Sequence, residues 1–296
     1  MPLRRTLNTA VKQVLSTLSG GRHGKGFRIF MYHSIDDTGA ALSVSPKDFR
    51  SHLSFLQQGG WHALTLVEAV ARLHGEPGSE REVWLTFDDG YENFYTHAAP
   101  LLNEFGFPGT VFLVTDLVGE KPLWFERDRA YIAQVLNSLP LTRTEYACLE
   151  NVMRDLAGAQ LMNWSQIREL QRYGIDFQGH SAGHHFLTTL PADELRADLD
   201  RSRQALADQL GIAATVLCYP YGDCNPSVRH AAEDTGFAAA VLADDSGADS
   251  TRYAIGRIGL SNLRPPSHFR FVLSAAFDHY ATWRRTAHHF LKGNVR

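Results

Sequence analysis

The sequence contains little cysteine and no long apolar run, and both absences narrow the class of protein. Its 296 residues include only three cysteines, Cys148, Cys218 and Cys224, too few for the disulfide framework of a small secreted protein. A bridge between Cys218 and Cys224 would require an oxidising compartment, so we expect free thiols. No apolar stretch approaches the roughly 18 residues that a membrane-spanning helix needs, so no such helix is predicted.

The chain also has no excess of positive charge. Lys and Arg number 29 against 32 Asp and Glu, a formal net charge of −3, which argues against a nucleic-acid-binding surface. The hydrophobic content of 44% and the charged content of 21% are ordinary for a globular protein with a full core. A single barrel domain routinely reaches about 250 residues, and no repeat, low-complexity segment or flexible linker divides this chain.

The N-terminal segment is basic but lacks the continuous apolar core of a secretory signal. We therefore expect a cytoplasmic protein. Apolar residues recur at helical spacing and predict an amphipathic helix within residues 1–26: Leu3, Leu7, Val11, Val14, Leu15 and Leu18. The helix is expected to pack on the rest of the protein; the alternative is that residues 1–18 lie on an anionic membrane surface.

Strand-like and helix-like segments alternate along the remaining chain, a pattern that predicts a parallel sheet or barrel. Strands are expected at 27–32, 82–87, 109–115, 174–179, 215–219, 237–242 and 253–258. Helices are expected at 45–59, 65–73, 91–105, 164–173, 191–210, from 225, and, as one amphipathic helix, at 269–291. Residues 117–162 form an insertion, predicted to be helical. Periodicity alone allows an open doubly wound sheet equally well.

Two of these helices have clear start signals. Ser45 precedes Pro46, a good first helical residue, and Thr65 with Glu68 forms a capping box. The helix at 191–210 places leucines at core spacing, and its many charges are most simply its solvated face.

Two adjacent carboxylates, Asp88 and Asp89, follow the strand-like segment 82–87 and precede Gly90. Like charges this close raise the pKa of one of the pair unless a cation is near. An Asp-Asp-Gly triplet on its own is more often a turn. At the end of a strand in an α/β fold, where ligands gather, the pair instead indicates a metal or a proton transfer.

A second cluster lies in a Gly-rich loop after the strand-like segment 174–179. This loop, Gly179-His180-Ser181-Ala182-Gly183-His184-His185, supplies imidazoles four residues apart. One carboxylate and two imidazoles are typical of a catalytic zinc-type site, with other positions left for water and substrate. The spare aspartate is then free to act as a base, so the sequence predicts a metal-dependent hydrolase.

These motifs resemble those of the polysaccharide deacetylases that share the NodB homology domain, carbohydrate esterase family 4. The resemblance covers roughly residues 27 to 262. It rests on Thr86-Phe87-Asp88-Asp89-Gly90, the His180-Ser181-x-x-His184 loop with Leu187-Thr188-x-Leu190, and Tyr219-Pro220-Tyr221-Gly222. Met31-Tyr32-His33-Ser34-Ile35 is similar to the first strand of the branch that acts on bacterial exopolysaccharides. The resemblance implies a distorted, incomplete (β/α)7 barrel, here residues 27–296.

The resemblance also implies roles for individual residues. Asp89, His180 and His184 would bind a divalent metal, zinc first, with cobalt, nickel, manganese or iron as alternatives. Asp88 would be the base that activates water, and the backbone N–H of Tyr221 would hold the oxyanion. The substrate would be an N-acetylhexosamine unit of a bacterial polysaccharide or its precursor, and the products acetate and a free amine.

The chain departs from the family pattern at two catalytic positions. Asn262 stands where the family has the histidine that donates a proton to the leaving amine, and Cys218 replaces an arginine. We expect His33 to be the acid, with a structural strand-capping role as the alternative. Arg257 is the candidate for the missing guanidinium, with a surface or helix-terminus salt bridge as the alternative.

Two nearby residues are less specific. His185 stands where the family usually has proline and is not counted as a ligand. Trp124 could stack on a sugar face, although a packing role in the insertion is favoured.

Two other functions are compatible with parts of this set of motifs. A deformylase or cyclic amide hydrolase of the same superfamily would use the same site on another substrate. A non-catalytic carbohydrate-binding protein is suggested by the two departures, but a pure binder has no need of the intact set of Asp88, Asp89, His180 and His184. The sequence sets neither the glycan nor the oligomeric state.

Overall fold

The computed structural model describes residues 26–138, 159–243, 251–262 and 267–277. The predicted helix within residues 1–26, Cys148 and the middle of the insertion lie outside the described residues. In the described part of the chain, every helix is too short or too polar to cross a bilayer. The membrane contact of residues 1–18 and the cytoplasmic location stay predictions.

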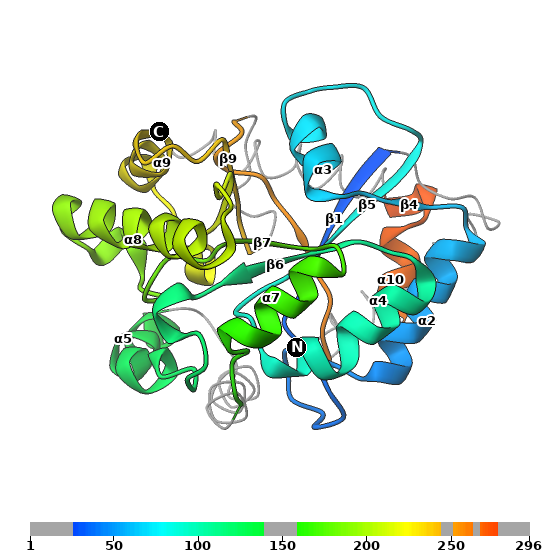
Figure 1. Cartoon of the computed structure of the whole chain (residues 1–296), viewed down its shortest axis with the longest axis horizontal. Helices are drawn as coiled ribbons and strands as arrows, with labels where there is room; N and C mark the ends of the chain where they lie inside the picture. The colour runs from blue at the N-terminus through cyan, green and yellow to red at the C-terminus, as the bar shows by residue number, and fades with distance from the viewer. Residues whose placement is uncertain (1–25, 139–158, 244–250, 263–266, 278–296) are drawn as a thin grey trace.

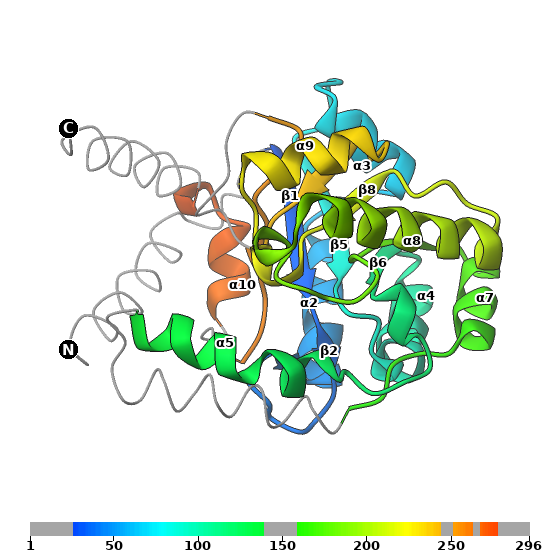
Figure 2. The same cartoon turned by 90° about the vertical axis from the view of Figure 1, so that its left-hand side faces the viewer.

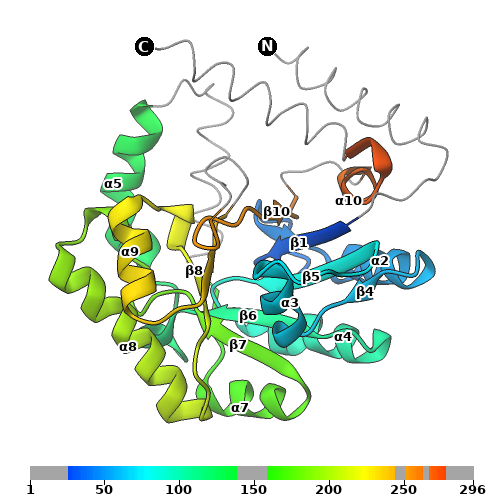
Figure 3. The same ribbon diagram turned by 90° about the horizontal axis from the view of Figure 1, so that it is seen from above.

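The centre of the molecule is a curved, parallel sheet in the order β10-β1-β5-β6-β7-β8-β9, with β4 paired to β5 at its edge. Figure 3 shows α2, α4, α7 and α8 outside this sheet. Its strands are β1 (Gly26–Tyr32), β4 (His62–Ala63), β5 (Arg81–Phe87), β6 (Gly109–Leu113), β7 (Ile175–Gly179), β8 (Val216–Cys218), β9 (Ala239–Val241) and β10 (Ile258–Gly259). β2 (Ser34–Ile35) and β3 (Ser43–Val44) form a separate pair.

A single short segment connects the two edges of the sheet. Ile255 forms a parallel bridge with Val241 in β9, while β10, three residues later, pairs with β1 through Ile258 and Phe30. The sheet is therefore curled into a barrel whose closure is narrow. This geometry agrees with the predicted incomplete (β/α) barrel and excludes an open doubly wound sheet.

Helices follow most strands and cover the outside of the barrel (Figure 1). They are α2 (Pro46–Gln58), α3 (Leu66–Leu73), α4 (Ala99–Phe105), α5 (Trp124–Ser138), α7 (Trp164–Arg172), α8 (Ala192–Leu210), α9 (Pro226–Asp234) and α10 (Ser267–Val272). Short helical turns are η1 (Phe94–Ala98), η2 (Thr115–Leu117), η3 (Leu187–Thr189) and η4 (Pro220–Gly222). In Figure 2, α5 extends away from the body of the barrel, as expected of an insertion.

Local sequence signals account for the helix starts. The Ser45 hydroxyl accepts a hydrogen bond from the N–H of Asp48, with Pro46 in the first turn of α2. The predicted capping box of Thr65 and Glu68 is present at the start of α3. These side chains satisfy N–H groups that a helix leaves unpaired at its first turn.

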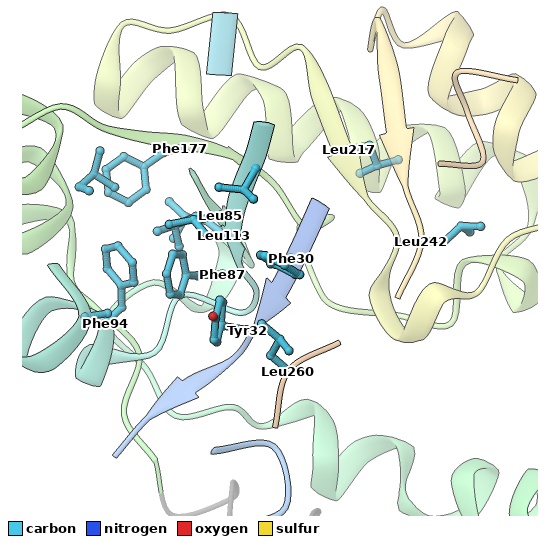
Figure 4. Packing of buried hydrophobic residues seen from close by; sticks show 14 of the residues in the cluster. Phe30, Tyr32, Leu85, Phe87, Phe94, Leu113, Phe177, Leu217, Leu242 and Leu260 are labelled. Carbon is cyan, nitrogen blue, oxygen red and sulfur yellow. The ribbon is translucent and has the colours of Figure 1, made fainter. Parts of the chain in front are cut away.

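The two faces of the sheet bury different cores. The larger core lies between the sheet and the outer helices, and Figure 4 shows its aromatic centre around Tyr32, Phe87 and Phe94. Ring centroids are 5.3 Å apart for Tyr32 and Phe87 and 4.7 Å apart for Phe87 and Phe94. The smaller core fills the barrel interior with side chains of the opposite strand parity: Ile29, Trp84, Phe112, Val216, Cys218 and Val241, joined by Leu64 and by Ala69 of α3.

Three predicted elements differ from the structure. The strand expected at 253–258 is reduced to β10, because the segment before it bends to reach both sheet edges. The helix expected at 91–105 contains the wide turn η1 before α4, where Pro100 has no N–H to continue the regular ladder. The helix expected at 269–291 starts earlier, at Ser267, and α10 ends at Val272; residues after 277 lie outside the described part.

His52 makes the fold sensitive to acid. Its ring stacks on Phe269 with centroids 3.9 Å apart, and its Nδ1 lies 3.1 Å from the hydroxyl of Tyr32. Burial lowers its pKa from 6.5 to about 4. Between these two pKa values His52 is protonated in the unfolded chain but neutral in the folded chain. The free energy of unfolding therefore falls as the pH drops from about 6.5 toward 4.

We predict that His52→Gln flattens this part of the stability profile. Urea unfolding at several pH values between 7 and 4 measures the free energy of unfolding of both proteins. Between pH 7 and 4 the free energy of unfolding of wild type should fall, relative to that of His52→Gln, by at most about 3.5 kcal/mol, because one pKa unit corresponds to about 1.4 kcal/mol. The exposed His74→Gln is the matched control, and parallel profiles for wild type and His52→Gln would contradict the prediction.

Candidate active site

Asp88 and Asp89 reach one centre because the backbone turns sharply between them. Asp88 continues the β5 ladder, its N–H bonding the carbonyl oxygen of Tyr32 at 2.9 Å. Asp89 then adopts a left-handed conformation with φ of 71°, followed by Gly90 with φ of 81°. Both carboxylates are buried, with 3% and 4% of their surface exposed, so each needs a charged or hydrogen-bonding partner.

The His loop follows β7 at the same edge of the sheet. The N–H of His180 bonds the carbonyl oxygen of Leu113 in β6 at 2.9 Å. Ser181 and His184 then take left-handed conformations with φ of 60° and 54°, and the Ser181 hydroxyl accepts from the N–H of His184 at 2.9 Å. This tight loop turns both imidazoles toward Asp89.

Asp89, His180 and His184 bring three metal-ligating atoms together. Oδ1 of Asp89 lies 3.3 Å from Nε2 of His180 and 3.3 Å from Nε2 of His184. Zinc binds such ligands at about 2.0–2.2 Å in tetrahedral geometry, which places neighbouring ligand atoms about 3.4 Å apart. The residues present therefore fit a divalent ion.

The hydrogen bond of His180 and the burial of His184 favour the ligating form of the two rings. Nδ1 of His180 lies 2.8 Å from the backbone carbonyl oxygen of Cys218. Since a carbonyl only accepts, Nδ1 carries the proton and Nε2 keeps its lone pair for a metal. Burial lowers the pKa of His184 and so favours its neutral ring. Burial would raise the pKa of Asp89, but the contacts of its carboxylate with the rings of His180 and His184 hold it well below its usual value.

Asp88 is paired with Arg257 inside the barrel. Nη1 and Nη2 of Arg257 donate to the two carboxylate oxygens at 2.7 and 2.6 Å. The guanidinium also donates from Nε to the carbonyl oxygen of Leu242 and from Nη1 to the hydroxyl of Thr86. Burial opposes the charge of Asp88, but Arg257 holds the pKa of that carboxyl below its usual value.

Arg257 is thus placed against the predicted base, not in a surface salt bridge. It precedes β10 and does not lie on the strand expected there. Cys218, where the resemblance to the family predicts an arginine, contacts it: Nη2 of Arg257 lies 3.0 Å from Sγ of Cys218. Cys218 and Cys224 are both free thiols, as expected.

A second set of potential ligands, Asp88, His180 and Cys218, also lies within 4.8 Å. Both oxygens of Asp88 already accept from Arg257, and burial raises the pKa of the Cys218 thiol, which disfavours the thiolate that a metal requires. The set of Asp89 and the two imidazoles is therefore the better metal site.

Tyr221 lies beside the His loop in a strained turn with φ of 58°. Among the described residues its backbone N–H has no hydrogen-bond acceptor. Its hydroxyl donates to Asp128 at 3.0 Å. Its ring stacks on Phe186, with centroids 4.0 Å apart, and meets His184 edge-on at 4.6 Å. The side chain is therefore fixed while the N–H remains able to donate.

His33 and Asn262 occupy different surroundings. His33 directly follows β1 and is half-buried, and it contributes, after burial and the two imidazoles, to the lowered pKa of Asp89. Asn262 instead holds the β3 segment: its backbone N–H bonds the carbonyl oxygen of Ser43, and its side-chain amide that of Ala40. His33 therefore lies close to the carboxylates, and Asn262 makes structural contacts.

Asp198 supports the His loop and was missed from the sequence. Although it lies in α8, it is 1% exposed and accepts from the N–H groups of Ala182 and Gly183, both at 3.0 Å. Assigning all charges of 191–210 to a solvated face was wrong at this position. Asp198 lies one residue before Leu199, on the buried stripe of the helix, and that spacing was the available signal.

The insertion also contacts the His loop. Arg127 in α5 donates to the carbonyl oxygens of Gly183 at 2.8 Å and His184 at 2.6 Å. Trp124 is 1% exposed, and its ring stacks on His184 with centroids 4.3 Å apart and planes 23° apart. Trp124 thus packs against a predicted metal ligand, in agreement with the packing role that was favoured over stacking on a sugar. Arg127 lies in no recognisable sequence motif, so the sequence did not indicate its contact with the His loop.

A family model for polysaccharide deacetylase matches residues 75–240, more than half of the chain. The chain belongs to the polysaccharide deacetylase family. The protein YxkH of Bacillus subtilis, which carries the name of a polysaccharide deacetylase, is 27% identical over 236 residues that cover 79% of this chain and 71% of that protein.

Two related proteins have names that state a substrate. The poly-β-1,6-N-acetyl-D-glucosamine N-deacetylase of Escherichia coli is 25% identical over 68% of this chain and 31% of that enzyme. The enzyme of the same name from Staphylococcus aureus is 24% identical over 66% of this chain and 60% of its own length. The chain therefore spans less than two thirds of either enzyme.

Solved structures share the fold. A Streptococcus pyogenes deacetylase, PplD, in complex with acetate superposes with a TM-score of 0.66, at 21% identity, over 85% of this chain and 99% of that chain. IcaB from Ammonifex degensii superposes with a TM-score of 0.65, at 22% identity, over 86% of this chain and 97% of that chain. These likenesses confirm the predicted distorted, incomplete (β/α)7 barrel, and the family match confirms the predicted enzyme class.

We predict that Asp198→Ala loosens the His loop. The change leaves two buried N–H groups without acceptors, and each unsatisfied group costs about 1–3 kcal/mol. The melting temperature should fall by several degrees, and the amides of Ala182 and Gly183 should exchange faster with deuterated solvent. Asp200→Ala, at an exposed position of the same helix, is the matched control. Unchanged exchange at the loop would show that Asp198 does not hold it.

Proposed function

We propose that the protein is a divalent-metal-dependent hydrolase that removes N-acetyl groups from N-acetylhexosamine units of a bacterial polysaccharide or its precursor. The observation that carries this proposal is the convergence of Asp89, His180 and His184 beside the buried pair of Asp88 and Arg257. The names of the Escherichia coli and Staphylococcus aureus relatives support an N-acetylglucosamine polymer as the substrate.

Asp89, His180 and His184 would hold the ion. Zinc is the first choice for one carboxylate and two imidazoles with further positions open, and cobalt, nickel, manganese and iron accept similar ligands. When bound, such an ion polarises a carbonyl group and lowers the pKa of water from about 15.7 to about 7.

Asp88 is proposed as the general base. Its carboxylate stays ionised beside Arg257, so it can accept a proton from the attacking water. Arg257 fixes both oxygens of the carboxylate and thereby limits the directions from which Asp88 can take that proton. In this role Arg257 replaces the guanidinium of the family's arginine, whose position Cys218 occupies in this chain.

Tyr221 and His33 complete the proposed set. Attack on the acetamido carbonyl places negative charge on its oxygen, and the N–H of Tyr221 is proposed to donate to that oxygen. The amine that leaves must gain a proton as the carbon–nitrogen bond breaks. His33 is proposed to supply it, because Asn262 has no titratable proton and is held by backbone groups.

Acetate release tests the function directly. The protein, loaded with zinc, should release acetate from N-acetylglucosamine oligomers in a panel of lengths and linkages, and a chelator should stop the release. Formate release from an N-formylated sugar, with no acetate release, would instead favour a deformylase. No product from either class of amide would contradict the proposal.

Metal content should separate the roles of the two aspartates. Asp89→Asn and His184→Ala should lose both bound zinc and activity. Asp88→Asn should retain zinc but lose about 100- to 10,000-fold in turnover, the range of general-base catalysis. Because Asp88→Asn leaves Arg257 without its carboxylate, elemental analysis is made on the folded fraction after size exclusion. Equal zinc loss in the Asp88 and Asp89 variants would show that this division of roles is wrong.

Leaving-group dependence should identify the acid. His33→Ala should keep its zinc and lose about 100-fold or more in N-deacetylation, because general-acid help is worth that much. Hydrolysis of p-nitrophenyl acetate should change far less, since its leaving group departs without a proton. Asp88→Asn, which removes the base, should slow both reactions. Equal losses on the two substrates in His33→Ala would assign His33 a structural role.

A further inference from the structure

A second concave site lies at the edge of the sheet opposite the catalytic residues. This basal groove has a volume of about 920 Å³, within the roughly 300–1,000 Å³ of sites that hold small ligands. It is lined by residues just before β6 and β7, together with parts of α3, η1, α4 and α7. The His loop starts at the other end of β7, about 13 Å away along the strand, so the basal groove is separate from the candidate active site.

The lining of the basal groove combines aromatic rings with negative charge. Four aromatic residues and two carboxylates line it, and none of its lining residues is Lys or Arg: Trp61, Tyr95, Phe107, Tyr173, Glu68 and Glu169. The Tyr173 side chain is 71% exposed at the end of α7. An exposed ring of this size beside carboxylates suits a ligand with an apolar face and a positive charge.

The two carboxylates differ in how far they are already used. Both oxygens of Glu68 are engaged, one with the N–H and hydroxyl of Thr65 and the other with the ring of His62 at 3.2 Å. Glu169 accepts from the hydroxyl of Tyr95 through Oε2 at 3.0 Å. Its other oxygen has no hydrogen bond from the described residues, and the residue is exposed and lines the groove. Glu169 is therefore the better acceptor for a cationic group.

We propose that the basal groove binds the de-N-acetylated glycan, with a hexosamine ring against Tyr173 and its ammonium group on Glu169. This inference rests on the proposed function, because removal of an acetyl group turns a neutral acetamide into a cation. The unreacted N-acetyl unit lacks that charge and should bind more weakly. A glycan held here by its product units would keep neighbouring N-acetyl units near the enzyme for further turnover.

Calorimetric titration of the full chain with a glucosamine tetramer tests the groove. Glu169→Gln should weaken binding about tenfold, since a hydrogen bond to a charged group is worth about that much. Tyr173→Ala, which removes the ring that the sugar contacts, should weaken binding about two- to tenfold. Glu194→Gln, at an exposed position of α8, is the matched control for charge and should bind like wild type. Both groove positions are exposed, and unchanged melting temperatures would show that the variants are folded.

Two further probes test the ligand class. The fully N-acetylated tetramer, titrated into the Asp88→Asn chain so that it is not consumed, should bind at least tenfold more weakly than the free amine. Spermidine, a cation without a ring, should also bind more weakly. Equal binding of spermidine would reduce the groove to a general cation site and overturn the proposal.

Acetate release distinguishes this inference from the function on which it rests. Glu169→Gln and Tyr173→Ala should release acetate from an N-acetylglucosamine dimer at the wild-type rate and lose activity only on long, partly deacetylated chains. If tetramer binding is unaffected by either substitution, the groove proposal fails while the deacetylase stands. If no glycan yields acetate, the deacetylase proposal fails whatever the titrations show.

Discussion

The buried ion pair of Asp88 and Arg257 is the constraint on which the active site depends. The five N–H groups of the guanidinium match five acceptor contacts: both oxygens of Asp88, the hydroxyl of Thr86, the carbonyl oxygen of Leu242 and the sulfur of Cys218. Breaking one side of such a pair leaves an uncompensated buried charge, which costs about 3–5 kcal/mol. The geometry therefore tolerates little change at either partner.

This pair also links the chemistry to the closure of the barrel. Arg257 lies in the short segment between Ile255, which pairs with β9, and Ile258, which pairs with β1. Its guanidinium reaches Asp88 only when that segment spans the two sheet edges. The orientation of the proposed base is thus a consequence of completing the fold, and a loosely closed barrel would have a misdirected carboxylate.

Backbone strain is concentrated in the same region. All four non-glycine residues with positive φ in the described chain lie in the site: Asp89, Ser181, His184 and Tyr221. Such conformations cost of order 1–3 kcal/mol each and persist only where surrounding contacts enforce them. Asp198 from beneath the His loop and Arg127 from the insertion supply such contacts. The geometry of the proposed metal ligands is therefore maintained by side chains from α5 and α8, helices that contribute none of these ligands.

The sequence predicted those parts of this arrangement that are determined by residues close together in the chain. The strand before Asp88, the Gly-rich loop around His180 and the start of α3 at Thr65 are set by neighbouring residues, and their positions could be read directly. The partners Asp198 and Arg127 are distant in sequence, and a single charged residue in a helix carries no mark of the loop it will meet.

The placement of Arg257 shows the same limit from another side. Cysteine in place of arginine at position 218 indicated that a guanidinium was missing from the motif. The length of the last strand, however, was overestimated, because β propensity does not report where a chain must bend between two sheet edges. Only the pairing of Ile255 and Ile258 with different strands explains why β10 is short. Arg257 has to leave the regular strand in order to enter the barrel.

The small thiol of Cys218 and the position of Arg257 depend on each other, because both side chains share the space beside Asp88. An arginine at position 218 would project from β8 into the interior where Arg257 already lies, and two buried guanidiniums beside one carboxylate would leave a positive charge unpaired. A small thiol at that position fills the space and accepts one N–H of Arg257. We propose that Arg257 supplies from the closing segment the guanidinium that the family motif would place at position 218 in β8, while Asp88 keeps its place. A departure from the family motif can therefore preserve the charge balance of the site, and the loss of a motif residue does not by itself imply the loss of its function.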